Sequence, residues 1–198
     1  MVKKAVTAAE ATARLNANPE YVARRARQEK IRQRSAAENR LAEAPLVEAL
    51  RSVGLEVASV WDLVNTSVPY PRALPVLLEH LQRSYPAVVR DGIARALAVR
   101  DAKSGWRVLL ESYRRETEKR PKSGLAAAIA AAADDEVIGD VIALAHDRRQ
   151  GSSRLLLLSA LSRSQDPRAG KALMELRADP ELQKEIQVIL RRLARRKA

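Results

Sequence analysis

The chain has 198 residues and a net charge of +12, and 46% of it is hydrophobic although only 3% is aromatic and Phe is absent. This composition predicts a core of Leu, Val, Ile and Ala, together with basic surfaces that suit nucleic acid or an acidic partner. The absence of Cys excludes disulfides, thiolate metal sites and a Cys nucleophile, and the lack of a signal-like or membrane-spanning apolar run favours a cytoplasmic protein with no membrane partner.

The positive charge is concentrated at the two ends of the chain. Residues 1–40 contain ten Lys and Arg against four Glu, and residues 184–198 contain six Lys and Arg against one Glu. The stretch between them, 41–183, has a net charge of only +1. We therefore expect an anionic partner to be contacted by the ends.

Residues 1–40 are predicted to form a basic N-terminal arm, either helical or disordered. Segment 19–44 has no Gly or internal Pro and favours helix, with a start at Asn18-Pro19. Its cations surround the helix instead of lining one face, and its apolar stripe is poor. A helix that is polar all round bridges solvent, binds a partner or is unstable alone. The phosphate-binding candidates of the arm are Arg24, Arg25, Arg27, Lys30, Arg32 and Arg34.

The arm has little capacity for base stacking. Tyr21 is the only aromatic residue near its arginines, which favours contact with a phosphate backbone. A solvated, solubilising surface is the alternative interpretation of both basic ends.

From residue 71 onward the sequence repeats every 32 residues. Four columns hold large aliphatic residues through four copies. The columns are Leu77, Leu109, Val141 and Leu173; Leu78, Leu110, Ile142 and Met174; Ile93, Leu125, Leu157 and Ile189; and Leu97, Ile129, Leu161 and Leu193. Each copy contains two apolar clusters at helical spacing, which predicts two short helices that share a core with the neighbouring copies.

Turn signals separate the predicted helices. Asp166-Pro167 and Asp179-Pro180 each place an acidic N-cap before a first-turn proline, and Gly151-Ser152-Ser153 precedes another helix. The 32-residue step reaches back to Trp61 and then fails at Asn65. Segment 41–70 is therefore predicted to form degenerate capping helices, with Trp61 as a core anchor.

Two further groups of basic residues follow from the repeat. Arg90, Lys122 and Arg154 occupy one column at the start of the second helix of three copies. They form either a line of positive charge that binds a ligand or, as we favour, a ladder of structural contacts. The column six residues earlier, where a partner acid is expected, reads Ser84, Glu116 and Arg148. The second group is the tail, with candidates Arg191, Arg192, Arg195, Arg196 and Lys197.

The repeat resembles HEAT repeats of the short bacterial kind, also called HEAT-like or phycobilisome-lyase-type repeats. The resemblance rests on VVRDGIARAL at 88–97 and SRLLLLSALSRSQDPRAGKALMEL at 153–176, and it covers about 71–198. It implies a right-handed α-solenoid that acts mainly as a binding scaffold, and it implies no catalytic residues.

The sequence contains no strong signature of an enzyme. His80 and His146 lack carboxylate pairs at ligand spacing, so neither a metal site nor a cofactor is expected, and glycine-rich phosphate loops are absent. HEAT-like DNA glycosylases use Trp, Asp and Arg, which brings Trp61-Asp62 and Trp106-Arg107 to attention. Both Trp residues fall in apolar columns, and aromatic residues are scarce for a site that handles bases.

Together these features predict an all-α, non-enzymatic scaffold with a basic arm (1–40), capping helices (41–70) and HEAT-like repeats ending in a basic tail (71–198). The solenoid is expected to dock a protein partner, and the basic ends to contact nucleic acid or a ribonucleoprotein. A protein–protein adaptor whose ends meet an acidic protein is the alternative, and a glycosylase comes third. The oligomeric state is left open.

Overall fold

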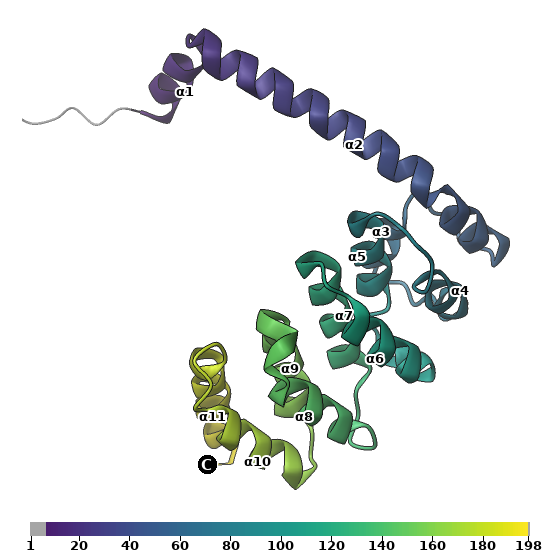
Figure 1. The fold of residues 1–198 in the computed structure, drawn as a ribbon, viewed down its shortest axis with the longest axis vertical. Helices are drawn as coiled ribbons and strands as arrows, with labels where there is room; N and C mark the ends of the chain where they lie inside the picture. Colours follow the sequence, from purple (N-terminus) through teal and green to yellow (C-terminus); the bar gives the residue numbers. More distant parts are fainter. Residues whose placement is uncertain (1–6, 198) are drawn as a thin grey trace, which may run out of the picture. The chain divides into compact units, whose positions relative to one another are not determined.

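The computed structural model describes residues 7–197, and within them the protein is all-α (Figure 1). This part of the chain contains eleven α-helices and two 3₁₀ helices and no strand. The all-α prediction is therefore confirmed. The chain divides into two compact units, and the division falls after Leu41.

The first unit contains α1 (Ala8–Asn16) and the beginning of α2 (Pro19–Ser52). The Thr7 side chain accepts a hydrogen bond from the Glu10 amide, and the Glu10 carboxylate accepts one from the Thr7 amide, which satisfies two amides at the start of α1. The Asn18 side chain likewise accepts from the amides of Glu20 and Tyr21, so α2 begins where the sequence predicts a helix.

Helix α2 continues without a break through residue 40, where the sequence predicts a boundary between the arm and separate capping helices. Pro45 lies inside it and costs the helix one backbone hydrogen bond. The helix persists because Leu46, Val47 and Leu50 are buried in the core of the second unit. The free energy gained by burying these apolar side chains thus outweighs the loss of one backbone hydrogen bond at Pro45.

The second unit contains the remaining helices. They are α3 (Val60–Val64), α4 (Ala73–His80), α5 (Ala87–Ala96), α6 (Trp106–Arg115), α7 (Lys119–Ala132), α8 (Ile138–His146), α9 (Arg154–Arg163), α10 (Pro167–Leu176) and α11 (Gln183–Lys197), with 3₁₀ helices η1 (Arg100–Gly105) and η2 (Arg148–Ser153). The buried Glu43 carboxylate joins the end of α2 to α3, because it accepts hydrogen bonds from the Ser59 hydroxyl and the Val60 amide.

The helices of the second unit pack in chain order (Figure 1). Helix α5 contacts α7, α7 contacts α9, and α9 contacts α11. Each of α4, α6, α8 and α10 contacts the odd-numbered helix that follows it. The odd-numbered and even-numbered helices therefore form two layers, and one continuous apolar core lies between them.

Three of the four aliphatic columns lie in this core. Those that begin at Leu77 and Ile93 are buried throughout, and the one that begins at Leu97 is buried except for the half-buried Leu193. The column that begins at Leu78 is different, because its last member, Met174, is 56% exposed. A residue next to a core position points about 100° away from it around the helix, which places this column at the edge of the core.

The helix starts predicted from the turn signals agree with the structure at some positions and not at others. Asp166 caps α10, since its side chain accepts a 2.8 Å hydrogen bond from the Arg168 amide in the turn that begins at Pro167. Asp179-Pro180 does not begin a helix directly: Pro180 lies in a turn, and α11 begins at Gln183. Gly151 has a φ of +61° inside η2, and α9 begins three residues later.

Candidate anion-binding surfaces

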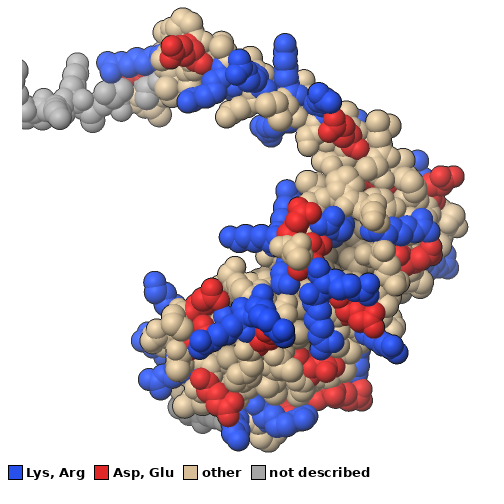
Figure 2. Space-filling view, in the orientation of Figure 1, with Lys and Arg blue, Asp and Glu red and all other residues tan. Residues whose placement is uncertain are grey.

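The basic residues of the arm lie on an exposed helix. All six candidates of α2 are exposed, and only Tyr21 and Asn39 are half-buried between Pro19 and Leu41. Figure 2 shows Lys and Arg side chains protruding along the visible face of this helix. At 3.6 residues per turn, the cations at positions 24, 25, 27 and 30 point in directions spread around the axis. The helix can therefore meet anions on more than one side.

Few of these cations have a partner. Arg32 lies 3.7 Å from Glu29 and Arg34 lies 2.9 Å from Glu38, and both pairs are exposed, so each contributes little to stability. The other four, Arg24, Arg25, Arg27 and Lys30, have no carboxylate within 4.0 Å among residues 7–197. Their charge is available to an external anion.

The basic tail lies on a helix that packs against the core. Ile186 and Ile189 of α11 are buried, and Leu193 is half-buried. Arg191, Arg192 and Arg195 are exposed on the same helix. The side chains of Arg196 and Lys197, also predicted to bind anions, lie outside the described part.

Arg154, the last member of the predicted column, is almost entirely enclosed by protein. Only 1% of its side chain is exposed, and its Nη1 donates to the Ala145 carbonyl and, at 2.9 Å, to Asp179. Its Nη2 donates to Glu181 at 2.6 Å, and its Nε donates to the Gly151 carbonyl. Hydrogen bonds from Arg154 hold the pKa of Asp179 below its usual range.

Arg90 makes a matching set of contacts. Its Nη1 donates to the Tyr85 carbonyl at 2.7 Å, and its remaining donors bond Glu116 at 2.9 Å and Glu118 at 2.6 Å. The acids that bond Arg90 and Arg154 come from the loops 25 to 28 residues later, and not from the residues six positions before them, Ser84 and Arg148. This geometry favours the structural ladder at both positions.

Lys122 differs from the other two members of the column. Its Nζ donates to the carbonyls of Tyr113 at 3.2 Å and Glu116 at 2.8 Å and lies 4.9 Å from the centre of the Tyr113 ring. No carboxylate in the described part lies within 4.0 Å of this ammonium group. Burial lowers the pKa of Lys122, and nearby Glu116 and Asp147 oppose that effect.

In the second unit, positive charge is concentrated on the odd-numbered helices α5, α7 and α9. The net charge of the whole segment 41–183 does not show this. Helices α5, α7 and α9 contain seven basic residues and one acid, whereas α4, α6 and α8 contain three of each. The one acid, Asp91, is buried and bonds Arg95 at 2.8 Å and Arg120 at 2.7 Å. Exposed Lys119 and Arg163 belong to the same layer. Counting charge helix by helix could have found this.

The residues considered for a glycosylase have structural roles here. Asp62 accepts hydrogen bonds from the amides of Ala58 at 2.8 Å and Ser59 at 3.1 Å, and it forms a capping box with Ser59, the N-cap of α3. The Trp106 indole donates to Asp140 at 2.8 Å, and the exposed Arg107 pairs with Glu111. Trp61 packs against the core, as expected of an anchor.

The two histidines lie in different surroundings. His80 is buried and its Nδ1 lies 2.7 Å from the Tyr85 hydroxyl, whereas the exposed His146 lies 3.5 Å from Glu175. Within the described residues, no cluster of three or more His, Asp or Glu is placed to hold a metal ion.

Comparisons with known proteins do not assign a family. No protein-family model, no curated protein and no solved structure matches the chain. Among the helices in residues 7–197, none combines the length and apolarity needed to cross a membrane.

Proposed function

We propose that this protein is a non-enzymatic binding scaffold whose basic ends contact nucleic acid, alone or within a ribonucleoprotein. The second unit acts as a HEAT-like α-solenoid that docks a protein partner. The proposal joins the charge of the ends to the stacked packing of the body. Each half rests on a separate observation.

The arm carries the nucleic-acid half of the proposal. Arg24, Arg25, Arg27 and Lys30 stand on an exposed helix without a carboxylate partner in the described part of the chain. A helix that is polar all round has no apolar face to stabilise it by burial against the protein core. Its four neighbouring cations repel one another, and a bound anion relieves that repulsion. Arginine presents a planar group of donors that matches phosphate. A phosphate backbone supplies such anions at regular spacing.

Support for the scaffold half comes from the second unit. The ordered contacts between odd-numbered helices and the 32-residue aliphatic columns are what a solenoid requires. Leu156 on α9 is 40% exposed, and Val188, 32 residues later on α11, is 46% exposed. The two side chains stand on helices that contact each other, and both offer apolar surface to a protein partner.

A salt series tests the nucleic-acid half. We would measure the affinity of the full chain for duplex DNA and for structured RNA between about 50 and 200 mM salt. The comparison variant changes Arg24, Arg25, Arg27 and Lys30 to Gln, which is also a good helix former. We expect wild type to bind with a steep salt dependence, and the slope of log K against log salt to fall by about 0.7–0.9 for each phosphate contact removed.

A matched variant controls for net charge. It changes four exposed cations of the second unit, Arg107, Arg115, Lys171 and Arg177, to Gln, so its total charge equals that of the arm variant. We expect it to keep the wild-type slope. Equal losses in both variants would show that net charge alone drives binding. No binding of wild type at low salt would reject the nucleic-acid role.

The protein–protein adaptor is the second candidate, and exposed Leu156 and Val188 favour it. An adaptor retains its partner at high salt, because apolar contacts are not screened. If wild type fails to bind nucleic acid, the pair Leu156→Ser and Val188→Ser should abolish capture of a partner that survives high salt. Changing exposed Met174 to Ser provides the control.

A further inference from the structure

The second unit has three equivalent joints, each formed by a basic residue near the start of a helix and the loop that packs against it. The basic residues are Arg90 on α5, Lys122 on α7 and Arg154 on α9, and their contacts differ. At the joints of Arg90 and Arg154, the following loop supplies two carboxylates to the guanidinium group. At the middle joint, Lys122 takes the place of Arg154, because the two are 32 residues apart. The same step places Asp147 at the position of Asp179 and Arg149 at the position of Glu181. The middle joint therefore has a cation where its neighbour has an acid.

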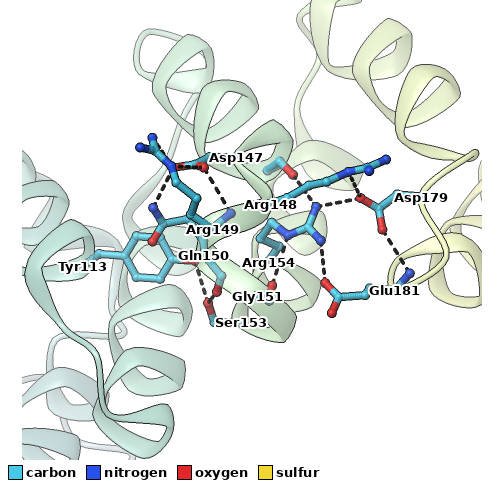
Figure 3. Close-up of polar contacts among 11 residues, drawn as sticks. Tyr113, Asp147, Arg148, Arg149, Gln150, Gly151, Ser153, Arg154, Asp179 and Glu181 are labelled. Carbon is cyan, nitrogen blue, oxygen red and sulfur yellow. Dashed lines mark hydrogen bonds and ion pairs between the residues drawn. The ribbon is translucent and has the colours of Figure 1, made fainter.

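The acid that remains at the middle joint is already engaged. Asp147 accepts two hydrogen bonds from the Arg149 side chain, at 2.8 and 3.1 Å, and one from Gln150 at 2.8 Å. Figure 3 shows this group on one side of η2 and the pairs of Arg154 with Asp179 and Glu181 on the other. Hydrogen bonds from Arg149 and Gln150 hold the pKa of Asp147 far below its usual range. Asp147 thus stays ionised but neutralises Arg149 and not Lys122.

A cavity of about 650 Å³ opens at this joint, between the first turn of α7 and η2. Four cations line it, namely Arg114, Lys119, Lys122 and Arg149. Two carboxylates also line it, but Glu116 is paired with Arg90 and Asp147 with Arg149. Thr117, Ser123 and Ser152 add hydroxyl groups to the lining, to which Gln150 and Ser153 also belong. The lining keeps a net positive charge that the protein itself does not balance.

Donors remain unused around the cavity. Lys122 has three ammonium protons, and the two carbonyls take only two of them. Arg149 has five N–H donors, and Asp147 takes two. A ligand in this cavity could accept hydrogen bonds from both Lys122 and Arg149. At the neighbouring joint, the corresponding acceptor is the Glu181 carboxylate of the protein itself.

From this comparison we propose that the cavity at the middle joint binds a phosphate group, held by Lys122 and Arg149 with Lys119 and Arg114 at its rim. A phosphate carries up to two negative charges and accepts several hydrogen bonds at once, which suits four cations and three hydroxyl groups. It replaces the carboxylate that the other joints receive from their own chain. The site lies entirely within the second unit and does not depend on the arm.

The decisive variant is Arg149→Glu, because it gives the middle joint the acid that its neighbour has. The introduced carboxylate can pair with Lys122 as Glu181 pairs with Arg154, so we expect the fold to be retained. Titration calorimetry of the full chain with sodium phosphate, at constant ionic strength, should show saturable binding for wild type. Arg149→Glu should weaken that binding by about tenfold or more, the effect of losing one good charged contact.

Two further variants complete the test. Arg177→Glu makes the same charge change at an exposed position outside the cavity, and it should bind phosphate as wild type does. Lys122→Met keeps the aliphatic chain but removes the ammonium group, and it should also lose binding. Circular dichroism and thermal melting of each variant establish that it is folded.

The phosphate can come from a free phosphomonoester or from a nucleic-acid backbone, and single-stranded RNA distinguishes these sources. If Arg149→Glu weakens RNA binding several-fold relative to Arg177→Glu, the group is a backbone phosphate. If the two variants bind RNA equally while Arg149→Glu has lost phosphate, the source is a monoester. The arm variant should bind inorganic phosphate normally in either case. No saturable binding by wild type, or unchanged binding by folded Arg149→Glu, overturns the proposal.

Discussion

Arg154 and Asp179 form an ion pair of 2.9 Å between Nη1 and Oδ2, and both side chains are almost wholly buried. The pair connects the first turn of α9 to the turn that precedes α11. Two carbonyls and Glu181 accept three further hydrogen bonds from Arg154, so four of the five N–H donors of this buried cation are engaged. Such a pair does little for net stability compared with an apolar replacement, but removal of one partner leaves a buried charge alone.

Arg154→Met should therefore destabilise the protein strongly. It leaves Asp179 without its buried partner, and we expect a loss of about 3 kcal/mol in the free energy of unfolding. Urea denaturation measures this. Arg148 lies 3.3 Å from the same carboxylate but is 76% exposed, so Arg148→Met should cost no more than about 1 kcal/mol. Equal losses in the two variants would contradict a special role for the buried pair.

The same pair should make stability depend on acid. Because Arg154 lowers the pKa of Asp179 in the folded state, the pair stabilises the protein above the unfolded-state pKa near 4 and loses this effect as pH falls toward the folded-state pKa. The difference in unfolding free energy between wild type and Asp179→Asn should thus be largest above about pH 5 and shrink below about pH 4. A constant difference across this range would contradict the shift.

His80 should make stability fall in mildly acidic solution. Burial lowers its pKa, and the positive charge of Arg83 lowers it further, so the folded protein holds His80 neutral. The unfolded chain binds a proton below about pH 6.5, and stability is lost as pH falls through that value toward the folded-state pKa. Between about pH 7.5 and 5.5, wild type should lose stability while His80→Phe should not. The other histidine, His146, is present in both proteins, so the difference isolates His80.

Two glycines should respond oppositely to alanine. A Cβ on Gly92 would lie 2.5 Å from Val60 and 3.1 Å from the Trp61 indole, where α3 packs on α5. Gly92→Ala should therefore cost about 1–3 kcal/mol through overpacking. Gly170 is exposed on α10 with nothing within 4 Å of its Cβ position, so Gly170→Ala should gain about 0.5–1 kcal/mol from helix propensity. Thermal melting compares them. Similar shifts in both would refute the close packing of α3 on α5.

Asp62 should stabilise the start of α3 as the third-position member of its capping box. Its carboxylate accepts from the amides of Ala58 and Ser59, so Asp62→Ala should lower the free energy of unfolding by about 1 kcal/mol. Asp62→Asn retains an acceptor oxygen and should recover part of the loss. If Asp62→Ala instead leaves stability unchanged and abolishes release of alkylated bases from DNA, the glycosylase interpretation would replace the scaffold.

The sequence by itself determined the features that depend on local chemistry. Helix starts at Asn18 and Asp166 could be predicted because a side-chain oxygen caps amides two or three residues away. The buried columns at Leu77 and Ile93 could be predicted because helical periodicity marks the face that must leave water. The six cations of the arm could be recognised in the same way, since a helix without an apolar stripe exposes all its charges.

Only the tertiary structure decided which groups meet across the sequence. Arg154 bonds acids 25 and 27 residues later. At the same distances from Lys122 stand Asp147, which bonds Arg149 instead, and Arg149 itself. Helix α2 passes through Pro45 because burial of the residues after it outweighs one lost hydrogen bond. Contacts of this kind depend on how helices pack, and packing energy is summed over residues that are far apart in the chain. The ion pairs of Arg90 and Arg154, and the lack of one at Lys122 in the described residues, therefore became evident only from the packing of the helices.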